Sequence, residues 1–208
     1  MTDPIFITGC PRSGITLTAA IINGCGAFGG VYSPRSSSKR DNPSFENMEI
    51  RDRVSTPYAQ MNGIRPASER IFSCAGRPLL SFPGLREHVE YYIRRDGYVD
   101  GPWFYKDHQL CLMWRAWHAA FPDATWIVVR RTNIDIVNSC MKTGFMDMFV
   151  ESSDWHRWVD LHLGAIEDMK RQADMNVQEV WPSRFIAGDF DEIAQVVTNA
   201  GLQWGCKE

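Results

Sequence analysis

Two short apolar runs are the clearest strand signals along the chain, and each is followed by a helical pattern. Residues 5–9 read IFITG, and residues 125–129 read TWIVV, which is rich in β-branched and aromatic side chains. Runs of this length that end in turn or charged residues are typical of buried strands. Shorter apolar runs at 103–105 and 184–187 predict two further strands.

Between these runs, apolar residues recur at three- and four-residue steps, which is the spacing of a helix with one buried face. The predicted helices cover residues 15–24, 45–62, 84–95, 110–120, 133–142, 153–174 and 189–200, with Gly201 as the C-cap of the last. Strands that alternate with helices require crossover connections and therefore a mainly parallel sheet. The sequence predicts a single α/β domain over residues 1–208.

Composition is that of an ordinary globular protein. Of 208 residues, 44% are hydrophobic and 23% are charged, and the net charge of −3 does not suggest a nucleic-acid partner. The six cysteines are scattered without a Cys-x-x-Cys pair, which favours reduced thiols over a zinc site or disulfides. We find neither a signal-peptide pattern nor an apolar run that could span a bilayer, so we expect a cytoplasmic protein without membrane contact.

The turn after the first strand has the layout of a phosphate-binding loop. Gly9, Gly14 and Thr16 fit the spacing of a Walker A motif, and the loop opens directly into a helix whose first N–H groups can face an anion. Ile15, however, occupies the position of the lysine that contacts the β- and γ-phosphates of ATP or GTP. Arg12 is then the nearest cation that could face a bound phosphate or sulfate.

The strand at 125–129 ends in Arg130 and Arg131, where a magnesium-dependent NTPase often has an aspartate for the metal. A basic strand end attracts an anion rather than a metal ion. Ser139 follows Arg131 by eight residues, about two turns into the next helix, so that both side chains could converge on a second phosphate.

Together, these two motifs resemble the sulfotransferases that use 3′-phosphoadenosine 5′-phosphosulfate (PAPS). The 5′-phosphosulfate loop of that family reads Pro-(Lys/Arg)-Ser-Gly-Thr-(Ser/Thr), and residues 11–16 match it except at Ile15. Its 3′-phosphate site pairs an Arg at a strand end with a Ser eight residues later, as Arg131 and Ser139 do, and Asp135 fits the family's Arg-Asn-Pro-x-Asp run. The resemblance implies a three-layer α/β sandwich like that of P-loop NTPases. It also implies a donor site made of Pro11, Arg12, Ser13, Gly14, Ile15, Thr16, Leu17, Arg131 and Ser139.

The family resemblance extends to the candidate catalytic residues. Residues 105–108 (Tyr-Lys-Asp-His) resemble the Lys-Thr-His of animal cytosolic enzymes and, more closely, the Lys-Asp-Pro-Arg of bacterial relatives. The bacterial type is also suggested by Gly29-Gly30 and by an Asn-Pro…Glu segment that ends at Glu46. Lys106 and Arg12 would then act on the transferred group and the leaving phosphate, and either His108 or Glu46 would be the base.

The resemblance implies transfer of a sulfuryl group from PAPS to a hydroxyl or amine of a small molecule or glycan, without a metal. Two alternatives stay open at this stage: a small-molecule kinase with a degenerate Walker A loop, and a non-catalytic nucleotide-binding module of the same fold. The basic stretch 33–40 and residues 63–83 are expected to line the acceptor pocket. Neither the acceptor nor the oligomeric state can be read from the sequence.

Overall fold

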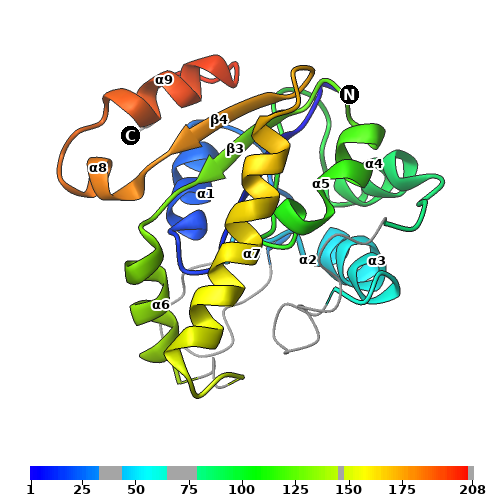
Figure 1. The fold of residues 1–208 in the computed structure, drawn as a ribbon. Coiled ribbons are helices and arrows are strands. Elements are labelled where there is room, and N and C mark those ends of the chain that lie inside the picture. The colour runs from blue at the N-terminus through cyan, green and yellow to red at the C-terminus, as the bar shows by residue number, and fades with distance from the viewer. Residues whose placement is uncertain (33–43, 65–78, 145–147, 206–208) are drawn as a thin grey trace.

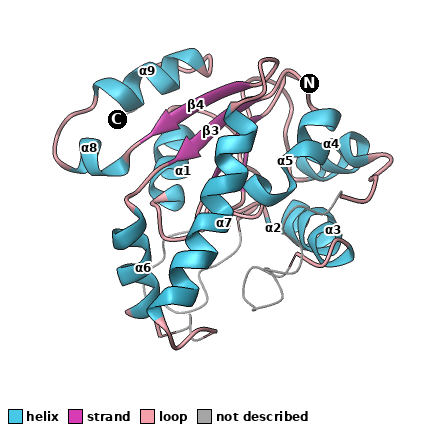
Figure 2. Ribbon diagram, in the orientation of Figure 1, coloured by secondary structure: helices cyan, strands magenta, loops and turns pink. Residues whose placement is uncertain are grey.

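A computed structural model describes residues 1–32, 44–64, 79–144 and 148–205, and within them the chain forms a parallel β-sheet between layers of helices (Figure 1). The described strands lie in the order β2-β1-β3-β4, and each neighbouring pair is parallel. Their bounds are Ile5–Gly9 (β1), Phe104–Lys106 (β2), Thr125–Val129 (β3) and Asn176–Val180 (β4). Figure 2 shows β3 and β4 as neighbouring arrows that point the same way.

Helices connect and cover the strands, which confirms the predicted α/β class with a parallel sheet. Their bounds are Ile15–Gly24 (α1), Met48–Ile50 (α2), Thr56–Met61 (α3), Leu85–Arg95 (α4), Leu110–Ala120 (α5), Asn133–Met141 (α6), Ser152–Lys170 (α7), Pro182–Ile186 (α8) and Asp191–Asn199 (α9). A π-helical segment, η1 (Arg51–Ser55), joins α2 to α3, so that the helix predicted over 45–62 runs without a break from residue 48 to 61.

Both faces of the sheet are buried. Phe6, Trp126 and Val128 project into a cluster with residues of α5 and α7, whereas Ile7 and Ile127 project into a second cluster with residues of α1 and α9. In Figure 1, α7 crosses in front of the sheet and α1 lies behind it. Because helices cover both faces, the strand residues are apolar without alternation, which is why β1 and β3 were so visible in the sequence.

The fourth strand lies earlier in the chain than predicted. The predicted strand at 184–187 is wrong: residues up to 186 belong to α8, which begins at Pro182. Proline suits the first position of a helix because its φ is already helical and it needs no hydrogen bond from its nitrogen. The actual strand, β4, has the sequence NVQEV and only Val180 is fully buried, since β4 is the edge of the described sheet. Its polar residues gave no apolar run to recognise.

The segment that carries Glu46 is anchored to the helical layer by Asn47, which is buried. Its side chain caps α2 by accepting a hydrogen bond from the amide of Ile50, and its Nδ2 donates to Asp96 Oδ2 at 2.7 Å. A cap of this kind fixes both the start of the helix and the direction from which the chain enters it. The predicted basic stretch 33–40, and residues 65–78 of the predicted acceptor segment, lie outside the described residues.

The chain can turn from β1 into the loop because residue 9 is a glycine. A Cβ at this position would lie 2.6 Å from the carbonyl oxygen of Val129 in β3 and 2.9 Å from Ser13 Oγ. The first of these neighbours is backbone within the sheet and cannot move aside. Gly9 is therefore required so that the loop can turn directly beneath the end of β3.

We expect Gly9→Ala to lower the free energy of unfolding by about 1–3 kcal/mol, the range for overpacking a fixed site. Urea denaturation would measure it. Gly164→Ala is the matched control: Gly164 lies inside α7, a Cβ there would meet nothing within 4 Å, and alanine should stabilise the helix by about 0.5–1 kcal/mol. Equal effects of the two substitutions would contradict the role given to Gly9.

Candidate active site

The loop between β1 and α1 presents unpaired amides to a cavity. Arg12 and Gly14 have positive φ angles of 72° and 105°, which turn the backbone so that α1 begins at Ile15. Among the described residues, the amides of Gly14, Ile15 and Thr16 have no hydrogen-bond acceptor. A Cβ at Gly14 would lie 2.8 Å from Pro182 Cγ, so α8 packs directly against the loop.

Ser13 adds a second unpaired polar group to this loop. The side chain is 2% exposed, and Ser13 Oγ has no hydrogen-bond partner within the described part of the chain. A buried hydroxyl without a partner is costly unless a ligand or water satisfies it. Free amides at a helix start beside an unpaired hydroxyl form a site that suits a phosphate or sulfate group.

The side chain of Ile15 points away from this site. It is 5% exposed and belongs to the apolar cluster between α1 and the sheet. Ile15 can therefore contribute its backbone amide to an anion, but position 15 holds no polar side chain there. Of the other predicted loop residues, Pro11 and Thr16 are partly exposed and Leu17 is 43% exposed, and all three line the cavity.

Arg131 and Ser139 both contact Arg12 of the loop. Arg12 Nε donates to Ser139 Oγ at 3.1 Å, and Arg131 Nη1 donates to the carbonyl oxygen of Arg12 at 2.9 Å. Ser139 comes from the second turn of α6, which starts directly after the end of β3 because Thr132 caps it. Thr132 Oγ1 accepts from the amide of Asp135 at 3.4 Å and donates to Asp135 Oδ2 at 2.6 Å, which gives Asp135 a structural role at the start of α6.

The two arginines at the end of β3 are not equivalent. Arg130 is 2.8 Å from Glu167 and 3.3 Å from Glu179, so two carboxylates neutralise it. Arg131 has no carboxylate within ion-pair distance among the described residues and is bound only to a carbonyl oxygen. The basic strand end predicted from the sequence thus provides one available charge, on Arg131.

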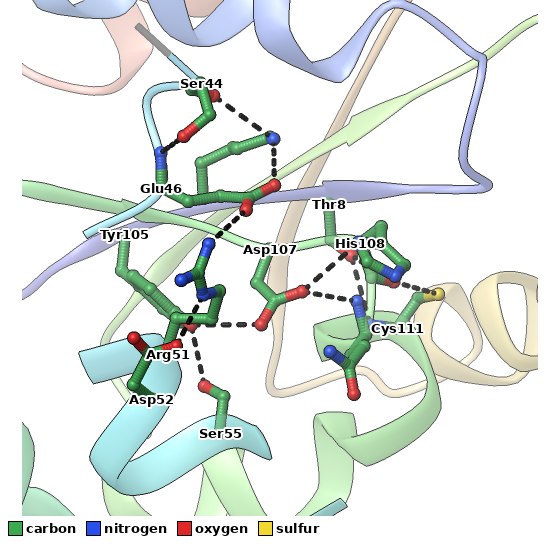
Figure 3. A network of polar contacts seen from close by, with 12 residues as sticks. Thr8, Ser44, Glu46, Arg51, Asp52, Ser55, Tyr105, Asp107, His108 and Cys111 are labelled. Carbon is green, nitrogen blue, oxygen red and sulfur yellow. Dashed lines mark hydrogen bonds and ion pairs between the residues drawn. The ribbon is translucent and has the colours of Figure 1, made fainter. Parts of the chain in front are cut away.

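On the other side of the cavity, Lys106 and Glu46 form a close ion pair. Lys106 Nζ lies 2.5 Å from Glu46 Oε1 and also donates to the carbonyl oxygen of Ser44 at 3.3 Å (Figure 3). Arg51 Nη1 lies 3.5 Å from the other carboxylate oxygen, Glu46 Oε2. Burial alone would raise the pKa of Glu46, but the positive charge around it, led by Lys106, lowers the pKa below its ordinary value.

His108 follows β2, and neighbouring residues contact both its carbonyl oxygen and its imidazole ring. Its carbonyl oxygen accepts hydrogen bonds from Cys111 Sγ at 3.1 Å and from Thr8 Oγ1 at 3.5 Å. Its Nδ1 lies 3.4 Å from Asp107 Oδ1 (Figure 3). Asp107 is 1% exposed and its pKa is raised by burial. The imidazole is 31% exposed and lines the cavity.

The loop, the end of β3 and the Lys106–Glu46 pair line one cavity of about 920 Å³. Its walls include the loop residues 11–17, Glu46, Lys106, His108 and Arg131. Ser139 is not part of the lining, and it reaches the site through Arg12.

Several wall residues were not found by sequence reasoning. They come from the segment after β4, from the segment before α7 and from α7 itself, namely Trp181, Pro182, Ser183, Ile186, Met148 and Trp158. The first four were missed because a strand was wrongly predicted at 184–187. The Trp-Pro pair at 181–182 could have indicated the end of a strand and the start of a helix. Asp107 was also missed, despite its place between Lys106 and His108.

The fold and the site define a parallel α/β protein with an anion-binding loop at the strand ends. The sequence profile of the sulfotransferase family matches residues 4–197, and the chain therefore belongs to that family. Among solved structures, the chain is similar to the crystal structure of sulfotransferase STF1 from Mycobacterium tuberculosis H37Rv. The identity is 15% and the TM-score 0.42, and the match covers 98% of this chain and 72% of that one. No significant match was found among curated protein sequences.

The described residues form no helix that is long and apolar enough to cross a membrane. Nor do they contain a group of three or more His, Cys, Asp or Glu side chains that could hold a metal ion.

The ion pair of Glu46 should make stability depend on acid pH. Because the folded-state pKa of Glu46 is lowered, its contribution is complete above the unfolded pKa of about 4.3 and is lost as the pH falls through the folded value. At pH 7 we expect Glu46→Gln to cost about 1–3 kcal/mol, less than a fully buried pair. The cost should stay nearly constant from pH 7 to about pH 5 and should shrink below about pH 4.3 in urea denaturation.

Glu167→Gln is the surface control for this measurement. Glu167 also pairs with Arg130 and Lys170 but is 40% exposed, so its loss should cost about 0–1 kcal/mol. A cost of Glu46→Gln that does not shrink between about pH 5 and about pH 3 would contradict the assignment of a charged, ion-paired Glu46.

Proposed function

We propose that this chain is a PAPS-dependent sulfotransferase that acts on a hydroxyl or amine of a small molecule or glycan. The family membership supports the reaction class. The observation that carries the finer proposal is that one cavity combines an amide-lined loop, an arginine without a carboxylate partner, and a lysine–histidine pair. These are the groups needed to hold two phosphates and to assist one displacement.

The residues present fit the donor in their chemistry. The unpaired amides of residues 14–16, Ser13 Oγ and Arg12 would hold the 5′-phosphosulfate. Arg131 and Ser139 would hold the 3′-phosphate, because their hydrogen-bonding groups meet at Arg12 on the adjoining side of the loop. The donor, when bound, supplies a sulfuryl group whose leaving group is a stable phosphate.

The displacement requires little covalent chemistry from the protein. The acceptor oxygen or nitrogen forms a bond to sulfur while the bond from sulfur to the 5′-phosphate oxygen breaks, and the acceptor's proton goes to a base. Positioning and stabilisation of the developing charge supply most of the rate enhancement in such transfers.

Lys106 can stabilise that charge without leaving Glu46. An ammonium group has three N–H donors, and in Lys106 Glu46 Oε1 and the carbonyl of Ser44 occupy two of them. One donor is left for a sulfuryl oxygen or the bridging oxygen. The ion pair thus holds the lysine in one place, which reduces the reorganisation needed during transfer.

His108 is a better base than Glu46 in this site. Both carboxylate oxygens of Glu46 face cations, and the lowered pKa makes that carboxylate a weak proton acceptor. An imidazole titrates near neutral pH and can accept the proton of a hydroxyl as the displacement proceeds. We therefore assign the base to His108 and a positioning role to Glu46.

A kinase reaction is less consistent with the same residues. A lysine in the conformation of Ile15 would lie in the apolar layer under the loop, and the end of β3 has arginines where a magnesium ligand would be expected. A kinase would bind Mg-ATP more tightly than adenosine 3′,5′-bisphosphate, so direct titration separates the two functions. The same titration combined with an absence of transfer would indicate a binding module.

We expect adenosine 3′,5′-bisphosphate to bind in calorimetric titration, and Arg131→Ala to weaken it by about 10- to 100-fold, the worth of charged hydrogen bonds. AMP, which lacks the 3′-phosphate, should lose little affinity in the same variant. Arg171→Ala, which removes an exposed arginine of the segment after α7, is the control and should bind both nucleotides as the native protein does. Equal weakening of both nucleotides by Arg131→Ala would contradict the 3′-phosphate assignment.

For catalysis, His108→Gln should lower kcat by about 10²- to 10⁴-fold with nearly unchanged donor affinity, the usual worth of a positioned base. The measurement is release of adenosine 3′,5′-bisphosphate from PAPS with a panel of phenols, alcohols, amines and glycans. Glu46→Gln should lower kcat less. A larger loss in Glu46→Gln than in His108→Gln would reverse the assignment of the base.

A further inference from the structure

The π-helical segment η1 contacts Glu46 at one end and, at the other, a tyrosine next to the strand end that carries His108. At its first residue, Arg51 lies 3.5 Å from Glu46, and at its last, Ser55 Oγ lies 2.7 Å from the hydroxyl of Tyr105. Segments of π-helix inside α-helices often occur at functional sites, where they redirect a side chain. The contact made by Ser55 begins a buried chain of polar groups that leads toward His108 (Figure 3).

The direction of the hydrogen bonds in this chain follows from the number of protons. Tyr105 has one hydroxyl proton, which it donates to Asp107 Oδ2 at 3.0 Å. The hydrogen bond between Ser55 and Tyr105 must then be donated by Ser55 Oγ. Ser55 and Tyr105 are 0% exposed and Asp107 is 1% exposed, so water does not compete for these groups.

The second oxygen of Asp107 faces the imidazole. Asp107 Oδ1 accepts a hydrogen bond from the amide of Gln109 at 2.9 Å and lies 3.4 Å from His108 Nδ1. A carboxylate beside Nδ1 favours the tautomer that carries its proton there, because that nitrogen can then donate to it. The other ring nitrogen, Nε2, is left with its lone pair for a proton from the cavity.

We propose that Ser55, Tyr105 and Asp107 form a positioning relay that holds His108 as its Nδ1–H tautomer, with Nε2 free to accept the acceptor's proton. The claim that Nε2 accepts the acceptor's proton rests on the proposed function, whereas the claim that His108 carries its proton on Nδ1 does not. None of the three residues needs to touch the substrate. They are positioning residues, and their removal should change the state of His108 rather than donor binding.

The test is Tyr105→Phe, which removes the donor to Asp107 and keeps the ring stacked on Trp117 at 5.3 Å. Long-range ¹⁵N NMR of the histidine rings at about pH 8, above the ordinary imidazole pKa, reports the tautomer. The His108 signals are assigned by their loss in His108→Gln. The native protein should show a protonated Nδ1, and Tyr105→Phe should show a mixture or a protonated Nε2.

Tyr58→Phe is the matched control. Tyr58 is also a buried tyrosine, 1% exposed, but its hydroxyl donates to the carbonyl of Leu80, away from His108. It should show the native tautomer. In transfer from PAPS, Tyr105→Phe should lower kcat by about 10- to 100-fold, the loss typical when an outer partner of a functional histidine is removed. The KM for PAPS should not change, and Tyr58→Phe should keep native kinetics.

Ser55→Ala is the second variant, and it decides the proposal if Tyr105→Phe does not fold. It should shift the tautomer in the same direction, and the kinetic effects of Ser55→Ala and Tyr105→Phe should be less than additive. A native tautomer in both variants would overturn the relay, whatever the enzyme's activity. If the tautomer shifts in the variants but the native protein transfers no sulfuryl group, the relay is supported and the proposed function is overturned.

Discussion

The site exists because the strands are parallel and both faces of their sheet are covered. With helices on either face, polar side chains lie at the ends of the strands or along the edge strand β4, and parallel strands end together. Gly9, Val129 and Val180 are in register across three strands. The segments that follow these residues therefore all begin at the carboxyl ends of the strands, which is where α/β sheets bind their ligands. The anion loop, Arg131 and the wall formed by Trp181 come from this end of the sheet, and Lys106 reaches it from β2.

Charge at this end of the sheet is distributed by local pairing rather than by the number of basic residues. Arg130 is neutralised by carboxylates of α7 and β4, and Lys106 is held by Glu46. Arg131 and Arg12 are the cations held only by neutral groups in the described part of the site. Both lie beside the loop. The protein can thus carry a net charge of −3 and still present a positive surface where phosphates would bind.

The parts of the fold predicted from sequence were those with strong local signals. The runs at 5–9 and 125–129 were recognised because burial on both faces makes them continuously apolar. The edge strand at 176–180 was missed because its polar residues are tolerated there, and the apolar residues at 185–187 were misread because a proline started a short helix. Arg131 and Ser139, which their spacing predicted to converge on a phosphate, both hydrogen-bond to Arg12, and their joint binding of a phosphate stays a prediction.

The spacing of residues along the sequence could not predict ion pairs and hydrogen bonds between residues that are far apart in the chain. The sequence left both His108 and Glu46 open as candidates for the base, and our proposed choice of His108 depends on the ion pair of Glu46 with Lys106 and on the carboxylate of Asp107. The hydrogen bond between Ser55 and Tyr105 likewise joins residues that are 50 positions apart in the chain.

The left-handed backbone of Arg12 has a consequence for attempts to stabilise this protein. A non-glycine residue with a φ of 72° costs about 1–2 kcal/mol relative to glycine. A search for stabilising substitutions would therefore select position 12 early and would favour glycine or asparagine there. Such a variant would gain thermal tolerance by discarding the guanidinium that reaches Ser139. At this position, robustness and ligand recognition are competing engineering goals.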